Sequence, residues 1–478
     1  MATSPPDTDV VILGAGPAGS CCALRLLQLG YRVTLVERAR FPRAQIGESL
    51  TPGIADILDL LGVRAQVDAL PRSAGAAWLV WEHADPAPRA AAHGNVMVDR
   101  ASFDEVLFQA VAQRGGRCLQ GAGMTALSGT PGAWQVRLAT AHGIDTVAAR
   151  FVVDATGRRN TDGALRTASA APLLALWTDL ERGPCANLVE ACPDGWLWGA
   201  ARPDGRFRIM AFGDPAGVRG QRPDRWLAAQ LARSRLFPMA VGAVLPGAVQ
   251  ACAATPAFSE AAWQPGVVRT GDAAFCIDPL SSSGVEKALR CSLQAAVAVH
   301  TVLADAADES LARTFYEHRL AESIATHRAW AQRYYNMAWP DDASPFWRAR
   351  RQDFAITPKS GSTLARLVAH TPAPARAPAP EPGTLLRGEV RRCDALDVID
   401  EPCVVDDRIQ LRRAIAHPNL PRPVAFVEGA EIVPLLDVLA AVPRLETAVE
   451  LWSYRMPPAR AARIAAWLCE QRLVRAVG

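Results

Sequence analysis

The chain has 478 residues, of which 50% are hydrophobic and 21% are charged, and its net charge is +3. This length predicts about three domains and is sufficient to bury a sizeable core. The ordinary apolar fraction and the balanced charge exclude disorder over most of the chain. Because the sequence has neither a basic excess nor a basic run, we do not expect a dedicated nucleic-acid-binding protein.

Membrane insertion and secretion are not indicated either. No window holds the roughly 18 uncharged apolar residues of a membrane span. The N-terminus lacks the basic region of a signal peptide, and the 11 cysteines show no metal-ligand spacing. We therefore expect a cytoplasmic protein without a metal site.

The first 37 residues contain the clearest pattern. Residues 9–13 read as a buried strand, residues 18–29 as a helix and residues 31–36 as a second strand, which together form a βαβ unit. The turn between the first strand and the helix carries Gly14, Gly16 and Gly19 in the motif G-A-G-P-A-G.

This glycine motif is typical of a dinucleotide-binding site. Gly14 permits the tight turn, Gly16 lets backbone amides approach a pyrophosphate, and Gly19 lets the helix pack on the strand. Glu37 closes the second strand and can accept hydrogen bonds from a ribose. An acid at this position favours FAD or NAD over NADP.

The middle of the chain is less regular. Alternating apolar patterns predict strands of an antiparallel sheet, and they lie at residues 77–81, 134–138, 196–200 and 206–212. Helical patterns begin after Gly284 and again cover residues 311–347.

Alternating Pro and Ala mark residues 371–384 as a semi-rigid linker and a domain boundary. Beyond it we expect short strands within residues 403–415 and 423–432. Three helices are expected at 434–441, 445–452 and 458–471. Residues 385–478 are therefore expected to form a small winged-helix-like α+β domain.

Three further segments favour FAD over NAD. Asp272 follows a predicted strand, so its carboxylate can hold a ribityl hydroxyl, and the turn over residues 278–284 can offer amides to a flavin ring. Residues 151–157 form another strand that ends in a small-residue turn. Residues 98–104 begin a helix that carries Arg100, a candidate pyrophosphate contact.

These segments, in this order, resemble the FAD-dependent monooxygenases of the para-hydroxybenzoate hydroxylase fold. The resemblance covers about the first 370 residues and implies a discontinuous α/β FAD-binding Rossmann-like domain. An antiparallel substrate sheet is expected at roughly 65–97 and 165–255. Residues 41–51, with the sequence G-E-S, are similar to the halogenase and geranylgeranyl-reductase branch of that fold.

The glycine motif and the resemblance together give a set of expected cofactor contacts. Arg43 is expected to face the FAD phosphates, and Gly47, Glu48 and Ser49 to line the flavin. The full expected set is Gly14, Gly16, Gly19, Glu37, Arg38, Arg43, Gly47, Ser49, Arg100, Asp272, Pro279, Ser283 and Gly284.

Three departures from the halogenase pattern favour hydroxylation over halogenation. Trp196 and Trp198 match the first half of the halogenase W-x-W-x-I-P motif, but Ala200 and Ala201 replace its second half. The stretch expected to carry the halogenase lysine has Arg72 and Ser73, and Arg cannot replace that amine. Ser281 stands where tryptophan halogenases have an acid.

Two carboxylates are candidates for acid/base catalysis, Glu48 and Asp278. For each, a structural role is the alternative: Glu48 as a partner of an amide or Arg, and Asp278 as a turn-forming residue. Trp196 and Trp198 are either core residues of a strand or the wall of a substrate pocket.

The C-terminal domain weakly resembles the peptide-recognition domains of peptide-modifying pathways. This resemblance implies a substrate residue within a peptide or protein, and the chain is compatible with the halogenase-like subgroup that hydroxylates peptidyl tryptophan during quinone cofactor biogenesis. Oxygen would be a co-substrate, and the electron donor either NAD(P)H or a separate flavin reductase. The alternatives are a halogenase, a geranylgeranyl-reductase-like enzyme and a non-catalytic flavin-binding assembly protein.

Overall fold

The computed structural model describes residues 8–89, 94–159, 165–240, 242, 248–371, 389–442 and 444–477. The chain forms two compact units, one over residues 1–309 and 316–371 and the other over residues 310–315 and 372–478. The predicted Pro/Ala linker, beyond Thr371, lies outside the described residues.

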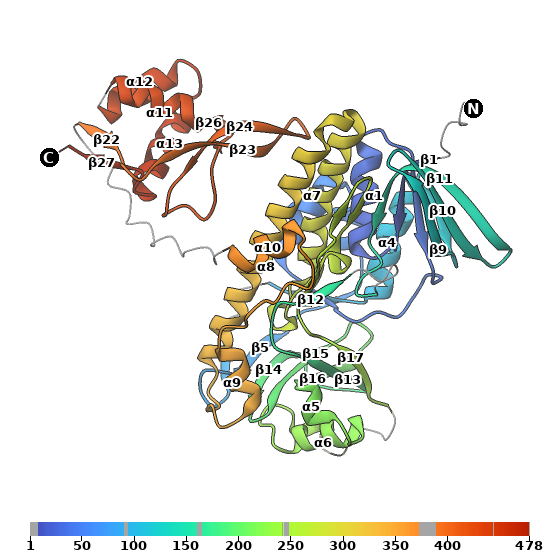
Figure 1. Ribbon diagram of the computed structural model, residues 1–478. Helices are drawn as coiled ribbons and strands as arrows, with labels where there is room; N and C mark the ends of the chain where they lie inside the picture. Colours follow the sequence, from blue (N-terminus) through green and yellow to red (C-terminus); the bar gives the residue numbers. More distant parts are fainter. Residues whose placement is uncertain are drawn as a thin grey trace. The chain divides into compact units, whose positions relative to one another are not determined.

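The strands of the predicted βαβ unit are inner strands of the first sheet, and Figure 1 labels its strand β1 and its helix α1. The βαβ unit consists of β1 (Thr8–Leu13), α1 (Pro17–Gln28) and β2 (Val33–Glu37). The sheet runs in the order β19-β20-β11-β1-β2-β8, and all of these neighbours are parallel except β19 and β20. The remaining strands are β8 (Arg117–Gln120), β11 (Gly143–Asp154), β19 (Trp263–Gln264) and β20 (Val267–Arg269).

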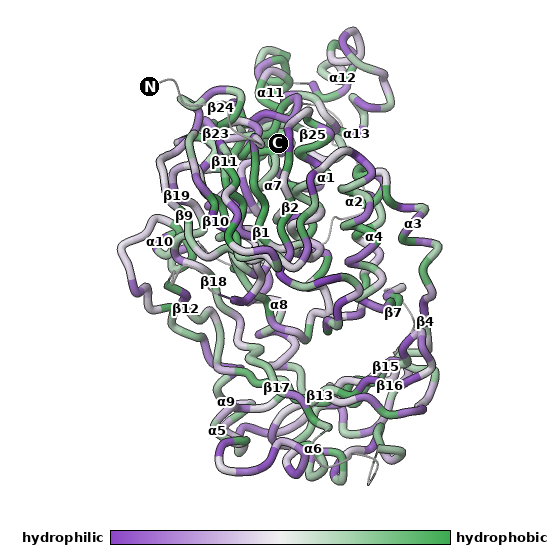
Figure 2. Tube along the Cα trace, turned by 90° about the vertical axis from the view of Figure 1, so that its right-hand side faces the viewer, coloured by the Kyte–Doolittle hydropathy of each residue, from purple (hydrophilic) through white to green (hydrophobic). Residues whose placement is uncertain are grey.

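Helices pack on this sheet through its apolar strands. Helix α1 contacts α4 (Arg100–Gln113) and α7 (Gly284–Ala304). Every residue of β2 is buried, as a strand covered on both faces requires. Figure 2 shows hydrophobic residues along β1, β2 and α7.

Residues 134–138 belong to this sheet and not to the substrate sheet. They lie in β10 (Ala133–Thr140), which pairs antiparallel with β9 (Gly123–Thr130) and β11. Their alternation is that of an antiparallel strand with one exposed face, and this pattern does not specify which sheet the strand joins.

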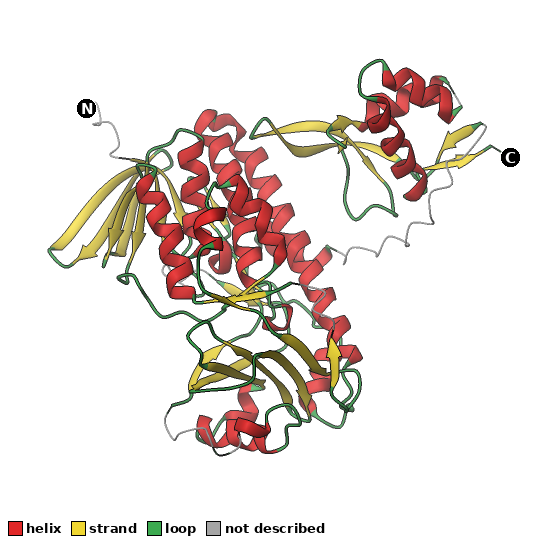
Figure 3. Cartoon of the chain, turned by 180° about the vertical axis from the view of Figure 1, so that it is seen from behind, coloured by secondary structure: helices red, strands yellow, loops and turns green. Residues whose placement is uncertain are grey.

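The second sheet of this unit runs in the order β17-β13-β16-β15-β14-β5-β6. It is mixed and not purely antiparallel as predicted, because β14 pairs with β5 in parallel. One face packs against α5 (Pro215–Val218) and α6 (Pro223–Ala232), as Figure 3 shows. The strands are β5 (Ala76–Val80), β6 (Ala87–Arg89), β13 (Leu174–Leu180), β14 (Ala186–Cys192), β15 (Gly195–Ala201), β16 (Phe207–Gly213) and β17 (Gln250–Ala253).

The predicted helical stretch 311–347 consists of two helices, α8 (Glu309–Met337) and α9 (Pro345–Arg351). Helix α8 ends at Ala338, whose backbone is extended. Pro340 follows two residues later, and a proline restricts the preceding residue to extended conformations, so the helix cannot continue. Helix α10 (Thr363–His370) ends this unit.

The second unit contains a β-hairpin and three helices. The predicted strand region 403–415 is a hairpin of β23 (Asp397–Val405) and β24 (Arg408–Ala416), and its turn residues Asp406 and Asp407 both have positive φ. The region predicted as a strand at 423–432 holds only two-residue strands, because α11 begins at Ile432. The helices are α11 (Ile432–Ala441), α12 (Leu445–Ser453) and α13 (Pro458–Glu470).

Within the described stretches, no helix is long and apolar enough to cross a membrane.

Trp452 is the largest fully buried side chain of the second unit, and its Nε1 donates to the Leu435 carbonyl at 3.2 Å. We expect Trp452→Ala to lower the free energy of unfolding of this unit by about 3–5 kcal/mol, since it leaves a cavity in the core. Leu451→Ala, at a position that is 40% exposed, is the control and should change it by less than about 0.5 kcal/mol. Pulse proteolysis of the full chain in urea measures both, and equal effects would contradict this packing.

Candidate functional site

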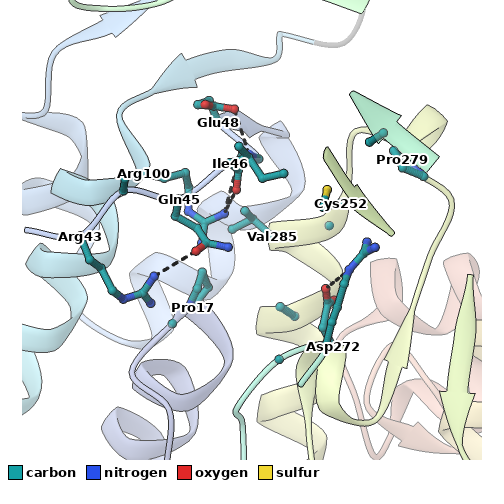
Figure 4. Close-up of a pocket in the computed structure, with 18 of the residues that line it drawn as sticks. Pro17, Arg43, Gln45, Ile46, Glu48, Arg100, Cys252, Asp272, Pro279 and Val285 are labelled. Carbon is teal, nitrogen blue, oxygen red and sulfur yellow. Dashed lines mark hydrogen bonds and ion pairs between the residues drawn. The ribbon is translucent and has the colours of Figure 1, made fainter. Parts of the chain in front are cut away.

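A cavity of about 1380 Å³ opens in the first unit. Its lining comes from the glycine turn before α1, from residues 42–49, from the segment 277–285 and from the face of the second sheet that is not covered by α5 and α6. Figure 4 shows Arg43, Arg100 and Glu48 on one side of it and Asp272, Cys252 and Pro279 on the other.

A different structural feature explains the absence of a side chain at each of the three glycines of the motif. Gly14 has φ +96°, and a Cβ there would lie 2.5 Å from the Ala155 carbonyl oxygen. A Cβ at Gly19 would lie 1.8 Å from the Gly14 carbonyl oxygen. A Cβ at Gly16 would meet only the flexible Arg43 side chain, at 3.5 Å. Gly14 and Gly19 are therefore needed by the fold, whereas Gly16 keeps space open in front of the helix.

Helix α1 begins at this space without a side-chain cap. Its first amides are consequently left for a ligand, and the helix dipole favours an anion there. At the end of β2, the Glu37 carboxylate accepts hydrogen bonds from the amides of Ala15 and Ala39, both at 3.0 Å. These bonds hold a buried acid beside the glycine turn, where a ribose would lie.

Arg43 and Arg100 share one buried acid, Asp104. Arg100 binds both Asp104 oxygens, at 2.9 and 3.1 Å, and also donates to the carbonyls of Ile46 and Gly47. Arg43 Nη2 lies 3.1 Å from Asp104 Oδ2. Arg43 Nε lies 3.6 Å from Glu37 Oε2, which is an ion pair but too long for a hydrogen bond, and this buried Nε has no hydrogen-bond acceptor among the described residues. Arg100 therefore holds the 46–47 loop, while Arg43 retains donor capacity for a phosphate.

Asp272 lies on the opposite side, between two cations. Its Oδ1 is 2.6 Å from Lys287 Nζ and its Oδ2 is 3.2 Å from Arg158 Nε. Burial acts to raise the pKa of Asp272, but the two cations outweigh it and hold that pKa well below its usual value. The carboxylate is thus ionised where a ribityl chain would pass.

Glu48 is not a free carboxylate. Its Oε1 is 2.6 Å from Arg208 Nη1, and its Oε2 accepts a hydrogen bond from the Gly47 amide at 2.9 Å. Arg208 also contacts both carboxylate oxygens of Asp179 on β13. The side chains of Glu48 and Arg208 are 2% and 4% exposed, so this pair corresponds to the structural alternative for Glu48.

Asp278 lines the cavity and is held by Tyr335 of α8. The Tyr335 hydroxyl is 3.2 and 3.0 Å from the two Asp278 oxygens, and Oδ1 also accepts the Leu280 amide at 3.0 Å. Burial raises the pKa of Asp278 above its usual value. Burial also raises the pKa of Tyr335, which keeps it a hydrogen-bond donor. Asp278 therefore combines the predicted turn role with the properties of a proton acceptor.

The uncovered sheet face presents cross-strand rows of decreasing polarity. Residues that are directly opposite share a face, so the register defines each row. The first row contains Asp179, Arg208, Ala200, Asn187 and Ala77. The second contains Trp177, Met210, Trp198, Val189 and Leu79, and the third contains Ala175, Phe212, Trp196 and Ala191.

This arrangement places both tryptophans of the predicted pocket in the cavity wall. Trp196 stacks on Phe212 with ring centroids 3.8 Å apart, and its other neighbour, Trp81, is packed on Tyr335 and Trp347. Trp196 is 2% exposed, whereas Trp198 is only partly buried. Trp196 consequently packs in the hydrophobic core and also lines the cavity, whereas Trp198 mainly lines the cavity.

Most of the expected cofactor residues meet in this cavity. Those that line it are Gly14, Gly16, Glu37, Arg38, Arg43, Gly47, Ser49, Arg100, Asp272, Pro279 and Gly284. Gly19 does not line it, because it packs α1 on the turn. Ser283 does not line it either: it is the N-cap of α7, and its hydroxyl bonds to Ser281 Oγ at 2.9 Å.

The sequence patterns did not single out Lys287, Arg158, Arg208, Trp177 or Tyr335. Arg158 follows the small-residue turn of residues 151–157, and Lys287 is one of two lysines in the chain, so each had a weak local signal. Tyr335 meets Asp278 across 57 residues, and no local pattern indicates that contact.

Comparisons with known proteins agree with this geometry. Residues 9–172 match the family of FAD dependent oxidoreductases, and residues 224–373 match the tryptophan halogenase family. The chain is 29% identical over 346 residues to a tryptophan 2-halogenase of Chondromyces crocatus. That match spans 66% of this chain and 65% of the relative, just under two thirds of its length.

Two longer matches extend the comparison. A putative FAD-dependent oxidoreductase, LodB, of Marinomonas mediterranea is 25% identical over 371 residues, which are 73% of this chain and 98% of that protein. A solved structure of the peptidyl tryptophan dihydroxylase QhpG, described as essential for tryptophylquinone cofactor biogenesis, has a TM-score of 0.75 at 24% identity. It covers 97% of this chain and 99% of its own, and at this identity it shows the fold alone.

The described residues fit FAD. The open space at Gly16, the uncapped start of α1 and the spare donor of Arg43 suit a pyrophosphate. Glu37 suits an adenosine ribose and Asp272 a ribityl chain. At Gly284 a Cβ would meet nothing within 4 Å, so the start of α7 leaves open space for a flat ring.

Gly16→Val tests the cofactor site. We expect the variant to keep the melting temperature of the FAD-free parent protein but to lose stoichiometric FAD, because only the ligand space at Gly16 is filled. Gly14→Val should lower both the melting temperature and the content of bound FAD, because its side chain collides with the backbone at a position of positive φ. Absorbance spectra of the purified proteins report the bound flavin. Stoichiometric FAD in Gly16→Val would contradict the assignment.

Proposed function

We propose that this FAD-dependent oxidoreductase, whose residues 9–172 match the FAD dependent oxidoreductases and whose residues 224–373 match the tryptophan halogenases, is a monooxygenase of an aromatic ring. The proposed substrate is an indole side chain within a peptide or protein, hydroxylated during quinone cofactor biogenesis. The observation that carries the proposal is the row of Trp177, Met210 and Trp198 across the cavity wall. These flat and polarizable side chains favour stacking of an aromatic ring.

Hydroxylation is favoured over halogenation by the chemistry of the cavity lining. The described residues that line the cavity include no lysine, so the amine that a halogenase uses has no counterpart there. Arg72, in the corresponding stretch, is exposed and binds Asp68. Ser73 lies beside it, and its hydroxyl donates to the Ala201 carbonyl.

A ring presented by a peptide is favoured over free tryptophan by the pairing of charges. The three arginines of the sheet face are Arg202, Arg206 and Arg208, and they are paired with Asp179, Asp204, Asp99 and Glu48. Of their buried nitrogens, only Arg202 Nε lacks a hydrogen-bond acceptor among the described residues. An incoming ammonium and carboxylate would therefore lose water and have to compete with the resident ion pairs, and this is costly. Neutral peptide groups avoid that cost.

Bound FAD would supply electron transfer and the activation of oxygen. The chain positions the ring against the aromatic row and excludes water from it. When oxygen adds to a ring carbon, that carbon must lose its proton to restore aromaticity. We assign this proton to an Asp278 carboxylate oxygen, and Tyr335 holds the carboxylate in place.

The second unit supports the choice of a peptide substrate through its size and architecture. A hairpin and three helices pack around their own core of buried residues, among them Leu436, Trp452 and Leu468. We propose that this winged-helix-like unit recruits the peptide and that electrons come from an external donor.

The proposal is tested with a tryptophan-containing peptide, FAD, a reductant and oxygen. We expect intact-mass spectra to show a gain of about 16 or 32 mass units, one or two oxygen atoms, on the tryptophan. Free tryptophan should react at least about tenfold more slowly, because its charges must compete with the ion pairs already present. The matched control is the same peptide with phenylalanine. A chloride- or bromide-containing product, or equal rates on free tryptophan, would contradict the proposal.

Asp278→Asn is expected to lower kcat for peptide hydroxylation by about 100-fold or more. In the parent protein the rate should fall as the pH falls through the raised pKa of Asp278, since only the ionised carboxylate accepts the proton. Tyr335→Phe removes a donor to that ionised form and should move this limb of the pH profile to higher pH. A pH–rate profile that is unchanged in Tyr335→Phe would contradict the assigned base.

A further inference from the structure

Lys287 stands out by its residue type and its place. The chain has 51 basic residues, and only Lys287 and Lys359 are lysines. Lys287 lies near the N-terminus of α7, where the helix dipole disfavours a cation. Its side chain is 3% exposed, and burying an ammonium is unfavourable by itself. Two costs at one residue require a compensating interaction.

That compensation comes from two acceptors on the segment before α7. Lys287 Nζ donates to Asp272 Oδ1 and to the Phe275 carbonyl oxygen, each at 2.6 Å. It also lies 4.7 Å from the centroid of the Phe275 ring. The two acceptors and the ring surround one compact ammonium, whereas a guanidinium is larger, planar and spreads its donors. This explains a lysine in an arginine-rich chain.

The ion pair is asymmetric with respect to the cavity. Asp272 lines the cavity with a side chain that is 34% exposed, and Lys287 binds it from the buried side. Figure 4 shows Asp272 at the cavity edge across from Arg43 and Arg100. Arg158, 41% exposed, contacts the other carboxylate oxygen at 3.2 Å. Lys287 is therefore the fixed partner, and Arg158 the one that solvent or a ligand can displace.

The other groups around this pair do not change its charge. The Cys276 thiol packs beside Asp272, its pKa raised by burial, so it stays neutral. Arg100 adds a more distant positive charge. On α8, His327 faces Lys287. Burial and the Lys287 charge lower the pKa of His327 to about 4, so the imidazole is neutral near pH 7. The neighbouring Glu286 is bonded to Thr51 and Arg290.

We propose that Lys287 is a positioning residue of the cofactor site, which fixes the Asp272 carboxylate in its ionised form for a ribityl hydroxyl of FAD. This role is independent of the substrate and of the chemistry after FAD has bound. It predicts that Lys287 acts on FAD only through Asp272.

The test is a titration of the apoprotein with FAD at several pH values between about 5.5 and 7.5. Flavin fluorescence reports the binding. We expect the Kd of Lys287→Gln for FAD to rise as the pH falls, because Asp272 without Lys287 is protonated more easily. Toward pH 5.5 the increase should approach about tenfold, the difference between a hydrogen bond of FAD to an ionised and to a neutral Asp272. The parent protein should show a nearly flat Kd over this range.

Two controls separate positioning from a general loss of structure. Lys359→Gln removes the other lysine, whose Nζ donates to the Arg166 carbonyl, and should leave the Kd and its pH dependence unchanged. Asp272→Asn should weaken FAD binding and give a Kd that does not change with pH. Adding Lys287→Gln to Asp272→Asn should neither raise this Kd further nor restore a pH dependence. This double variant buries no unpaired charge, so it keeps the test usable if Lys287→Gln folds poorly.

The proposal would be overturned if Lys287→Gln lowered the melting temperature but left the Kd for FAD unchanged at every pH. So would a double variant that binds FAD clearly more weakly than Asp272→Asn alone. Neither result depends on the substrate, so each can be told apart from failure of the proposed hydroxylation.

Discussion

The buried ion pair between Glu48 and Arg208 joins the two halves of the cavity. Glu48 belongs to the loop that faces the cofactor space, and Arg208 belongs to the sheet that forms the aromatic wall. Removal of Arg208 would leave the Glu48 carboxylate as a buried charge without its cation, which is strongly destabilising. The loop and the wall are therefore held at one separation. The positions of the cofactor space and of Trp198 relative to each other depend on it.

Charge pairing is also the main feature of the rest of the cavity. Asp272 is bound by Lys287 and Arg158, Asp104 by Arg100 and Arg43, and the arginines of the sheet face by their own acids. This leaves an apolar aromatic surface for the substrate and a cofactor half whose acids are held in place by cations. This division of the cavity suits the proposed substrate, an aromatic side chain that reacts while the peptide groups beside it carry no charge.

Most of the residues that local patterns assigned to cofactor binding lie in one cavity. The glycine motif, Glu37 and Asp272 lie in segments where strand, turn and helix follow each other directly, so spacing alone indicates their roles. The wall was predicted only in part. Residues 134–138 alternate like the strands of the wall but join the other sheet, and β5 reaches β14 in parallel across about 100 residues. Sheet membership is decided by tertiary packing, which alternation does not encode.

The same limit explains why the sequence alone could not distinguish between the two candidate catalytic residues. Asp278 and Glu48 had equal standing in the sequence, and only their partners distinguish them: a neutral tyrosine for Asp278 and a buried arginine for Glu48. Both contacts join distant segments. Lys287 differs, because its rarity in the composition was visible in the sequence although its partner was not.

The measurement that tests the account most directly is the source of the oxygen in the product. The FAD-loaded protein, with a reductant and a tryptophan-containing peptide, is supplied with isotopically heavy oxygen gas in ordinary water. The account predicts that the heavy isotope appears in the peptide and that the yield falls when Asp278 is replaced by Asn. Oxygen taken only from water, or consumption of all the gas as peroxide with the peptide unchanged, would contradict it.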